Sequence, residues 1–410
     1  MFLEDYGYNF LLLSRITRSI GIIYVTLSSP LYLSSIGIKP ELIGVLFLGA
    51  IGFSSFITLT LGILGDKYGY RKILIISDLI SALSALILSI TSNVYLIALA
   101  LIIGGVGGAA GGIRGAFSPG LTALVASNWV NETERVKRMS LLMSAASFSG
   151  IGGSFLLSIR SLINNTVEGY RILYAISFIL LLMSVISLFF VREVKRPKKT
   201  SKIIKKSSAK YIFKVIISNS ITGFGLGIAI PLLPLWFKLA FHANSSEIGM
   251  IFTFSYLTTA LGSFLASKIR SNPLKIASIT RIFNGVLLVA MALSPWFILA
   301  SVLYVIRGFN AGIGSPNRSI VNVRGVSNED FGTASSLQGL ATRLSQMSSG
   351  LSGYLLDYYL PLPLEIGGLL QAIGGYVYMK LLSRYKEVKV ETQDLKEGKD
   401  NAESRRSESK

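Results

Sequence analysis

The sequence predicts an all-helical, polytopic membrane protein, and three observations lead to this fold class. Hydrophobic residues make up 51% of the 410-residue chain, and the mean hydropathy of +0.58 is too high for a soluble domain of this length. Apolar stretches of about 20 residues, long enough to cross about 30 Å of hydrocarbon, recur along the chain. These stretches do not alternate in polarity, which argues against membrane-spanning strands and leaves helices.

Twelve such stretches are present, and each is predicted to be a transmembrane helix. They cover about residues 10–31, 42–63, 72–91, 94–119, 139–159, 170–191, 211–235, 248–267, 274–293, 296–317, 331–355 and 362–382. In the fourth, the glycines Gly104, Gly108 and Gly112 recur every four residues, which favours close helix packing in lipid. In the seventh, the pair Pro231 and Pro234 predicts a bend near the outer end.

The basic residues are concentrated on one side of the predicted membrane. The chain has 40 Lys and Arg against 21 Asp and Glu, a net charge of +19. Residues 192–214 alone hold ten Lys or Arg against one acid, Glu193. The loops on the other side hold only Lys39, Arg160, Arg171 and Lys238. This asymmetry places both termini in the cytoplasm of a multi-pass cell-membrane protein, so nucleic acid is not an expected partner.

The chain lacks the residues of common catalytic and metal sites. It has no cysteine and a single histidine, His242, which excludes disulfides, thiolate metal sites and cysteine nucleophiles. No Ser/His/Asp grouping, phosphate-binding loop or metal-spaced cluster appears, so neither an enzyme nor an ATP-driven pump is predicted. We expect no cofactor and no metal, and a monomer whose partners are a small-molecule substrate and the lipid bilayer.

The two halves of the chain repeat one another. Ser118-Pro119 is followed at a fixed spacing by Asn131-Glu132, and Ser315-Pro316 is followed at the same spacing by Asn328-Glu329. The predicted organisation is an N-terminal six-helix bundle over 1–191, a basic cytoplasmic linker over 192–210, a C-terminal six-helix bundle over 211–383 and a disordered cytoplasmic tail over 384–410.

The most specific motif lies between the second and third stretches. It reads Gly62-Ile63-Leu64-Gly65-Asp66-Lys67-Tyr68-Gly69-Tyr70-Arg71-Lys72. This order of glycine, acid, glycine and basic pair resembles the loop 2–3 signature of the major facilitator superfamily, whose members are secondary transporters. The resemblance covers nearly the whole chain, except the tail after about Ser383.

The resemblance implies two pseudo-symmetric six-helix bundles that open a shared cavity alternately to each side of the membrane. The general appearance is that of the multidrug-exporter-like branch, which implies efflux of a small molecule. Two motifs of that branch are altered here, because Leu101 stands where span 4 has an arginine and Gly150-Ile151 stands where span 5 has Gly-Pro. The alternatives are an organic-anion carrier and a non-transporting sensor on the same fold.

By the same resemblance, the loop motif acts as a gate on the cytoplasmic side. Gly69 permits a tight turn, since it has no Cβ penalty at positive φ. The acid faces the positive end of the helix dipole at the start of span 11. The basic pair is expected to meet two acids after span 4 and to latch the two halves in the outward-facing state. The gate residues are Gly62, Asp66, Gly69, Arg71, Lys72, Glu132 and Glu134.

Several arginines lie inside the predicted spans, where a charge is costly and indicates function. Arg307 and Arg343 are near the midpoints of their spans, whereas Arg18 and Arg114 are displaced toward the cytoplasm. Arg15 and Arg281 are interpreted as snorkelling to the cytoplasmic interface. The candidate cavity residues are Arg18, Arg114, Tyr304, Arg307, Asn310, Gln338, Arg343 and Gln346.

No carboxylate is found at the centre of a span. Asp78 lies near the start of the third span, and Asp357 and Glu365 lie near the outer surface. A carboxylate proton relay therefore has no evident member. The mid-membrane arginines are satisfied either by an anionic substrate or by carbonyls and side-chain amides. The sequence leaves open which face of span 11 lines the cavity.

Overall fold

The computed structural model describes residues 6–105, 117–129, 132–194, 206–266, 268–269, 271–326 and 331–383. The elements are α1 Tyr8–Ser35, α2 Pro40–Tyr68, α3 Tyr70–Ile90, α4 Val94–Ile103, α5 Phe117–Asn128, α6 Glu132–Ile159, the 3₁₀ turn η1 Arg160–Leu162, α7 Thr166–Phe189, α8 Lys206–Ala229, α9 Leu233–Phe241, α10 Ser245–Ala266, α11 Pro273–Ala292, α12 Phe297–Val323, α13 Phe331–Gln346, α14 Ser349–Tyr358 and α15 Leu362–Leu382. The all-helical membrane class is confirmed, since nine helices of the described chain are long and apolar enough to span a bilayer.

Three of the predicted spans are divided in the structure. Span 4 corresponds to α4 and α5, and residues 106–116 between them lie outside the described part. Span 7 corresponds to α8 and α9, with Pro231 in the break and Pro234 in the first turn of α9. Span 11 corresponds to α13 and α14, which meet at residues 347–348. The linker residues 195–205 and the tail 384–410 also lie outside the described residues.

Local sequence sets several helix ends. Asn93 and Asn165 accept hydrogen bonds from amides in the first turns of α4 and α7, and Asn272 does the same for α11. Pro40 and Pro273 stand in the first turns of α2 and α11, where the missing amide hydrogen is not needed.

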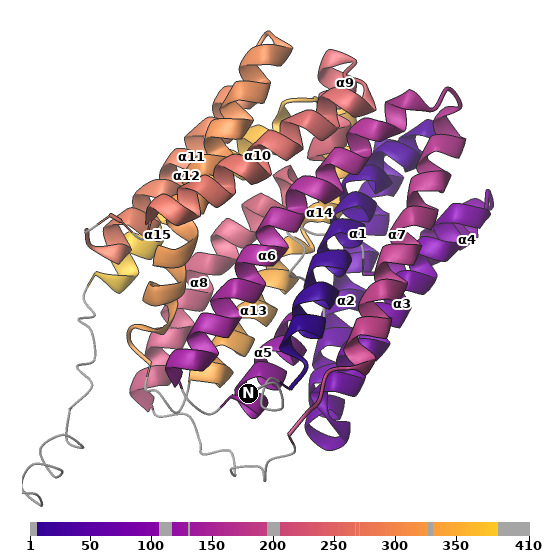
Figure 1. Ribbon diagram of the computed structural model, residues 1–410. Coiled ribbons are helices and arrows are strands. Elements are labelled where there is room, and N and C mark those ends of the chain that lie inside the picture. The colour runs from indigo at the N-terminus through magenta and orange to yellow at the C-terminus, as the bar shows by residue number, and fades with distance from the viewer. Residues whose placement is uncertain are drawn as a thin grey trace, which may run out of the picture.

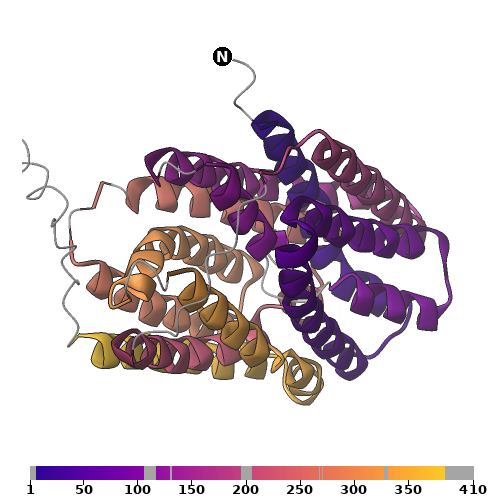
Figure 2. The ribbon, with the colours of Figure 1, turned by 90° about the horizontal axis from the view of Figure 1, so that it is seen from below.

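The helices form two bundles, the N-half from α1 to α7 and the C-half from α8 to α15. Figure 1 shows the start of α1 at the bottom and α9 at the top. In Figure 2, seen from below, most indigo and purple helices lie on the right and most orange and yellow helices on the left. Equivalent helices pack alike in each half: α1 and α3 pack on α7, as α8 and α11 pack on α15. Between halves, α6 packs on α10 and α2 packs on α14.

We name the two ends of the molecule by the chain. The terminal face holds the start of α1, the end of α7 and the end of α15, and the distal face holds the turns before α2 and α10. Near the distal face one apolar cluster joins both halves, with Tyr32 and Tyr174 of the N-half and Trp236 and Phe252 of the C-half among its buried members.

Toward the terminal face the core is divided. One cluster there contains only N-half residues, among them Leu74, Leu124 and Leu188. A separate cluster contains only C-half residues, among them Tyr211 and Tyr378. The bundles therefore share a hydrophobic core at the distal end and have separate cores at the terminal end.

Candidate functional site

The loop between α2 and α3 forms a tight turn that a distant acid stabilises. Gly69 has φ of 102°, a conformation that favours glycine. Glu193 accepts hydrogen bonds from the backbone amides of Tyr70 and Arg71 at 2.7 and 2.8 Å. The carboxylate thus caps the positive N-terminus of α3. Glu193, the one acid in the basic segment 192–214, is not among the gate residues predicted from the sequence.

The Arg71 side chain contacts the end of α7. Its guanidinium donates to the carbonyls of Leu188 and Phe189 at 3.1 and 2.7 Å. Cations at a helix C-terminus satisfy the last free carbonyls there. Glu134, the expected partner, instead forms an ion pair with Arg138 at 2.8 Å.

The remaining gate residues divide into two groups. Lys72 is exposed at the start of α3. The side chains of Asp66 and Glu132, and the surroundings of Gly62, lie outside the described part of the chain. The latch between the halves therefore stays a prediction.

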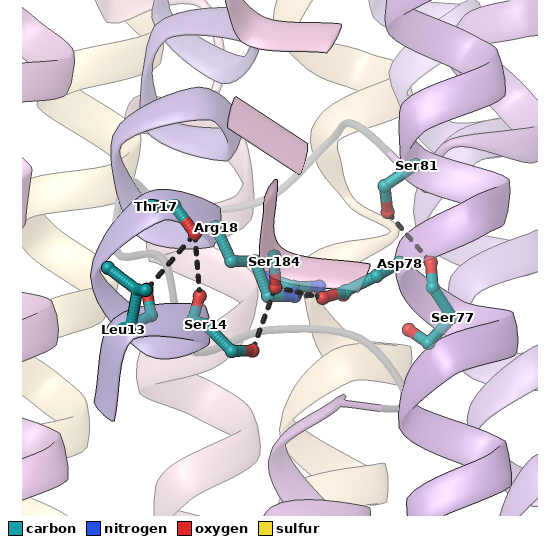
Figure 3. Close-up of polar contacts among 8 residues, drawn as sticks. All are labelled: Leu13, Ser14, Thr17, Arg18, Ser77, Asp78, Ser81 and Ser184. Carbon is teal, nitrogen blue, oxygen red and sulfur yellow. Dashed lines mark hydrogen bonds and ion pairs between the residues drawn. The ribbon is translucent and has the colours of Figure 1, made fainter. Parts of the chain in front are cut away.

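A buried ion pair lies inside the N-half (Figure 3). The Arg18 Nε donates to Asp78 at 2.7 Å, and Ser184 donates to the second carboxylate oxygen at 2.5 Å. Ser14 contacts Ser184 at 2.8 Å. Arg18 is 2% exposed and Asp78 is fully buried. The cluster joins α1, α3 and α7 within one bundle.

This pair shows that Asp78, predicted near the start of its span, reaches a buried arginine. Helix α3 begins at Tyr70, so Asp78 lies about 12 Å along the helix at 1.5 Å per residue. Helix α1 begins at Tyr8, which brings Arg18 to a similar depth. Arg18 is consequently held inside the N-half by a carboxylate of its own bundle.

Arg15 is fully buried in the N-half, and neither Arg15 nor Arg281 snorkels to the interface. Arg281 is buried in the C-half. It is 5% exposed, and its Nη2 donates to Asn219 Oδ1 at 2.6 Å. The guanidinium carbon lies 4.0 Å from the centre of the Tyr378 ring, a stacking distance for a cation–π contact. Its Nε and Nη1 have no hydrogen-bond partner among the described residues.

The candidates on α12 have different surroundings. Tyr304 is buried and packs on Phe252 with ring centres 4.9 Å apart. Asn310 donates to the carbonyl of Thr280 and to Asn284, both at 2.8 Å, which ties α12 to α11. Arg307 lies 5.9 Å from the Tyr304 ring, and its buried Nε has no partner within the described chain.

A cavity of about 360 Å³ lies between α8, α12 and α13 toward the terminal face. It brings together three of the predicted residues, Gln338, Arg343 and Gln346. Arg343 also donates to Thr58 of α2 at 2.6 Å, across the boundary between the halves. The other lining residues, which the sequence reading did not select, are Asn219, Ser319, Asn322, Val323, Gly339 and Thr342. Arg114 lies outside the described residues.

The sequence profile of the Major Facilitator Superfamily matches residues 11–220 and again 215–403. The chain belongs to this superfamily. It is therefore a membrane transporter and not an enzyme, and a small-molecule substrate follows from the family. The first matched region covers the N-half and continues into α8, and the second covers the C-half from within α8 onward. No curated protein matches the sequence significantly.

Solved structures of other transporters share the fold of this superfamily member. An auto-inhibited POT family peptide transporter superposes with a TM-score of 0.74 at 11% identity, covering 94% of this chain and 98% of the other. A bacterial homolog of the human lysosomal transporter Spinster, inward-facing and occupied, gives 0.70 at 14% identity, covering 93% and 97%. A D-xylose–proton symporter gives 0.70 at 15% identity, covering 93% and 98%. At these identities the likeness concerns the fold.

Proposed function

We propose that this transporter exports a small molecule by alternating access, and that the described conformation is open to the cytoplasm. The observation that carries alternating access and the open side is the divided core, joined across the halves at the distal face and separate at the terminal face. Two bundles that share a core at one end only can rock about that end. Alternating access in this type of fold consists largely of such a movement.

Polar contacts support closure of the distal face. Lys238 donates to Ser34 at 3.2 Å, which links α9 to the end of α1. Thr253 donates to Ser154 at 3.1 Å, which links α10 to α6. These links have to break when the cavity opens on this side.

The assignment of the terminal face to the cytoplasm rests on charge. The segment after α7 starts the run of ten Lys or Arg between residues 192 and 214. Loops rich in Lys and Arg remain on the cytoplasmic side of a membrane. Both termini then lie in the cytoplasm of a cell-membrane protein.

The gate role of the loop between α2 and α3 belongs to the opposite state. In the described conformation Arg71 is engaged with the carbonyls at the end of α7. A contact with Glu132 or Glu134 requires an exchange of partners when the terminal face closes. The Glu193 cap holds the start of α3 and thereby presents the loop to the other half.

The test is flux through the purified protein. Reconstituted liposomes are loaded with radiolabelled benzoate, glucose or ethidium, which are anionic, neutral and cationic, and transport is followed with and without a pH gradient. We expect movement of at least one solute that depends on the protein, and faster movement toward the face opposite the termini. Binding of a solute without flux would favour a sensor and contradict the carrier.

A further inference from the structure

The two halves place a polar cluster at equivalent positions but with different charge. A shift of 203 residues takes Asp78 of α3 to Arg281 of α11, and the buried positions Ser77 and Ser81 to the buried positions Thr280 and Asn284. A shift of 201 residues takes Arg18 of α1 to Asn219 of α8, and likewise takes Pro30 to Pro231. The pair formed by the first and third spans of the N-half is thus repeated by the first and third spans of the C-half.

In the N-half the Arg18–Asp78 pair is neutral, and the buried Arg15 lies near the same carboxylate. Arg18 and Asp78 meet at 2.7 Å, and Ser184 of α7 donates to the same carboxylate. In the C-half the roles change, because the cation is on the third span and its partner is the neutral amide of Asn219 at 2.6 Å. The residue from the last span is the Tyr378 ring, 4.0 Å from the guanidinium carbon.

The charge of Arg281 therefore lacks a counter-ion in the described part of the C-half. The titratable groups near it are Tyr378 and Arg318, and Arg318 adds a second positive charge. Two of the three guanidinium nitrogens have no hydrogen-bond partner among the described residues, and the side chain is 5% exposed. A buried charge in this condition is unfavourable unless an opposite charge joins it.

The side chains that hold Arg281 and Tyr378 also line the cavity of about 360 Å³. Asn219 accepts from Arg281 through its oxygen, so its amide nitrogen retains two donors. Asn322 accepts from the Tyr378 hydroxyl at 2.8 Å. Arg343 lines the same cavity. The cavity thus combines amide donors with Arg343 in its wall and Arg281 directly behind Asn219.

We propose that this cavity binds the anionic group of the transported solute, a carboxylate or a similar oxyanion, and that Arg281 supplies the uncompensated charge that attracts it. The anionic group of the solute is the counter-ion of Arg281, as the Asp78 carboxylate is the counter-ion of Arg18 in the N-half. Because the bound group belongs to a transported solute, this inference rests on the proposed transport function. Charge-assisted contacts to arginine and amide donors are the recognition chemistry expected for such a group.

The test introduces the missing carboxylate into the protein. Asn219→Asp places an acid at hydrogen-bonding distance from Arg281 and recreates the pair of the N-half. The thermal unfolding midpoint of the detergent-purified protein is measured against added benzoate, with neutral benzamide as the control solute. We expect benzoate to stabilise the wild type, and Asn219→Asp to unfold at a higher midpoint without anion and to bind benzoate more weakly by about tenfold or more.

Two further variants keep the test decisive. Arg281→Gln removes the charge without adding a carboxylate and should also lose the response to benzoate. Asn93→Asp adds the same charge at the exposed cap of α4, far from the cavity, and should respond like the wild type. Equal responses of wild type and Asn219→Asp, or no stabilisation of the wild type by any anion tested, would overturn the proposal.

Chloride and phosphate separate a solute from a free inorganic ion. If they stabilise the protein and benzoate does not, the assignment to a solute is wrong. Flux separates this inference from the carrier function: transport of a neutral solute with no anion response refutes only the anion site. Anion binding that depends on Arg281, without flux of any solute, retains the anion-binding cavity but refutes the assignment to a transported solute.

Discussion

At the residue scale, burial alone does not distinguish the arginines of this transporter. Arg18 and Arg281 are both nearly inaccessible, with 2% and 5% exposure. The first is neutralised by a carboxylate on a neighbouring helix, and the second is met by an amide oxygen and an aromatic face. The partner therefore decides whether a buried cation stabilises its own bundle or remains available to an external anion.

The N-half pair predicts a large stability loss when its acid is removed. Asp78→Asn leaves Arg18 buried beside a neutral side chain, and we expect the free energy of unfolding to fall by about 3–5 kcal/mol. The measurement is denaturant or thermal unfolding in detergent. Glu134→Gln, which breaks the more exposed pair with Arg138, should change the same quantity by less than about 1 kcal/mol.

A double variant tests the cause of that loss. Replacing Arg18 and Asp78 together by leucine removes both charges, and stability should recover most of what Asp78→Asn loses. A double variant as unstable as the single one would mean that the ion pair is not the source of the effect.

At the element scale, small residues allow helices of the two halves to approach closely. A methyl group on Gly353 of α14 would overlap the carbonyl of Pro40 at the start of α2, and Gly44 faces Gly353 from α2. On the other side of the interface, Gly249 of α10 lies against the backbone of α6 near Ser158. Residues without bulky side chains are typical where membrane helices pack closely.

Gly353→Ala is expected to prevent full closure of the distal face. The added methyl group cannot be accommodated without moving α14 away from α2, so the population should shift toward the state open at the distal face. The readouts are a lower transport rate and faster thiol labelling of a single cysteine introduced at Ser34. Gly152→Ala, where the new methyl group would make ordinary contacts with Ile20, should change neither.

At the scale of the whole molecule, the distribution of apolar contacts defines the conformational state. The shared distal core is large and aromatic, while each half keeps its own core at the terminal face. Opening the distal face breaks its apolar and polar contacts together. New contacts at the closed terminal face have to compensate for their loss. The relative free energies of these two sets of contacts determine the resting population.

Cross-linking the distal face should stop transport. Ser154 of α6 and Thr253 of α10 face each other with their side-chain oxygens 3.1 Å apart, so two cysteines introduced at these positions would have their sulfur atoms close together. The wild-type chain has no cysteine, so the introduced pair is the only one. We expect oxidation of the Ser154→Cys, Thr253→Cys double variant to abolish flux and reduction to restore it. Each single variant, oxidised in the same way, should remain active; undiminished flux in the oxidised double variant would contradict the rocking movement.

Much of the architecture was predictable because membrane spans are governed by local composition. About twenty apolar residues in a row determine a helix in lipid, and the repeated Ser-Pro and Asn-Glu pairs indicated two related halves. The positive φ of Gly69 also followed from its place in the loop motif. Helix ends were less predictable, and the true start of α3 at Tyr70 altered the depth assigned to Asp78.

The sequence by itself determined the helices, the division into two bundles and the family of this transporter, because hydropathy, charge asymmetry and a continuous motif are all properties of neighbouring residues. Only the tertiary structure decided which charges meet. Arg18 and Asp78 are sixty residues apart, and Arg281 and Asn219 are sixty-two apart, so their contacts depend on helix packing and register. The same packing decided that Arg18 meets a carboxylate of its own half, whereas Arg281 meets an amide oxygen next to a cavity.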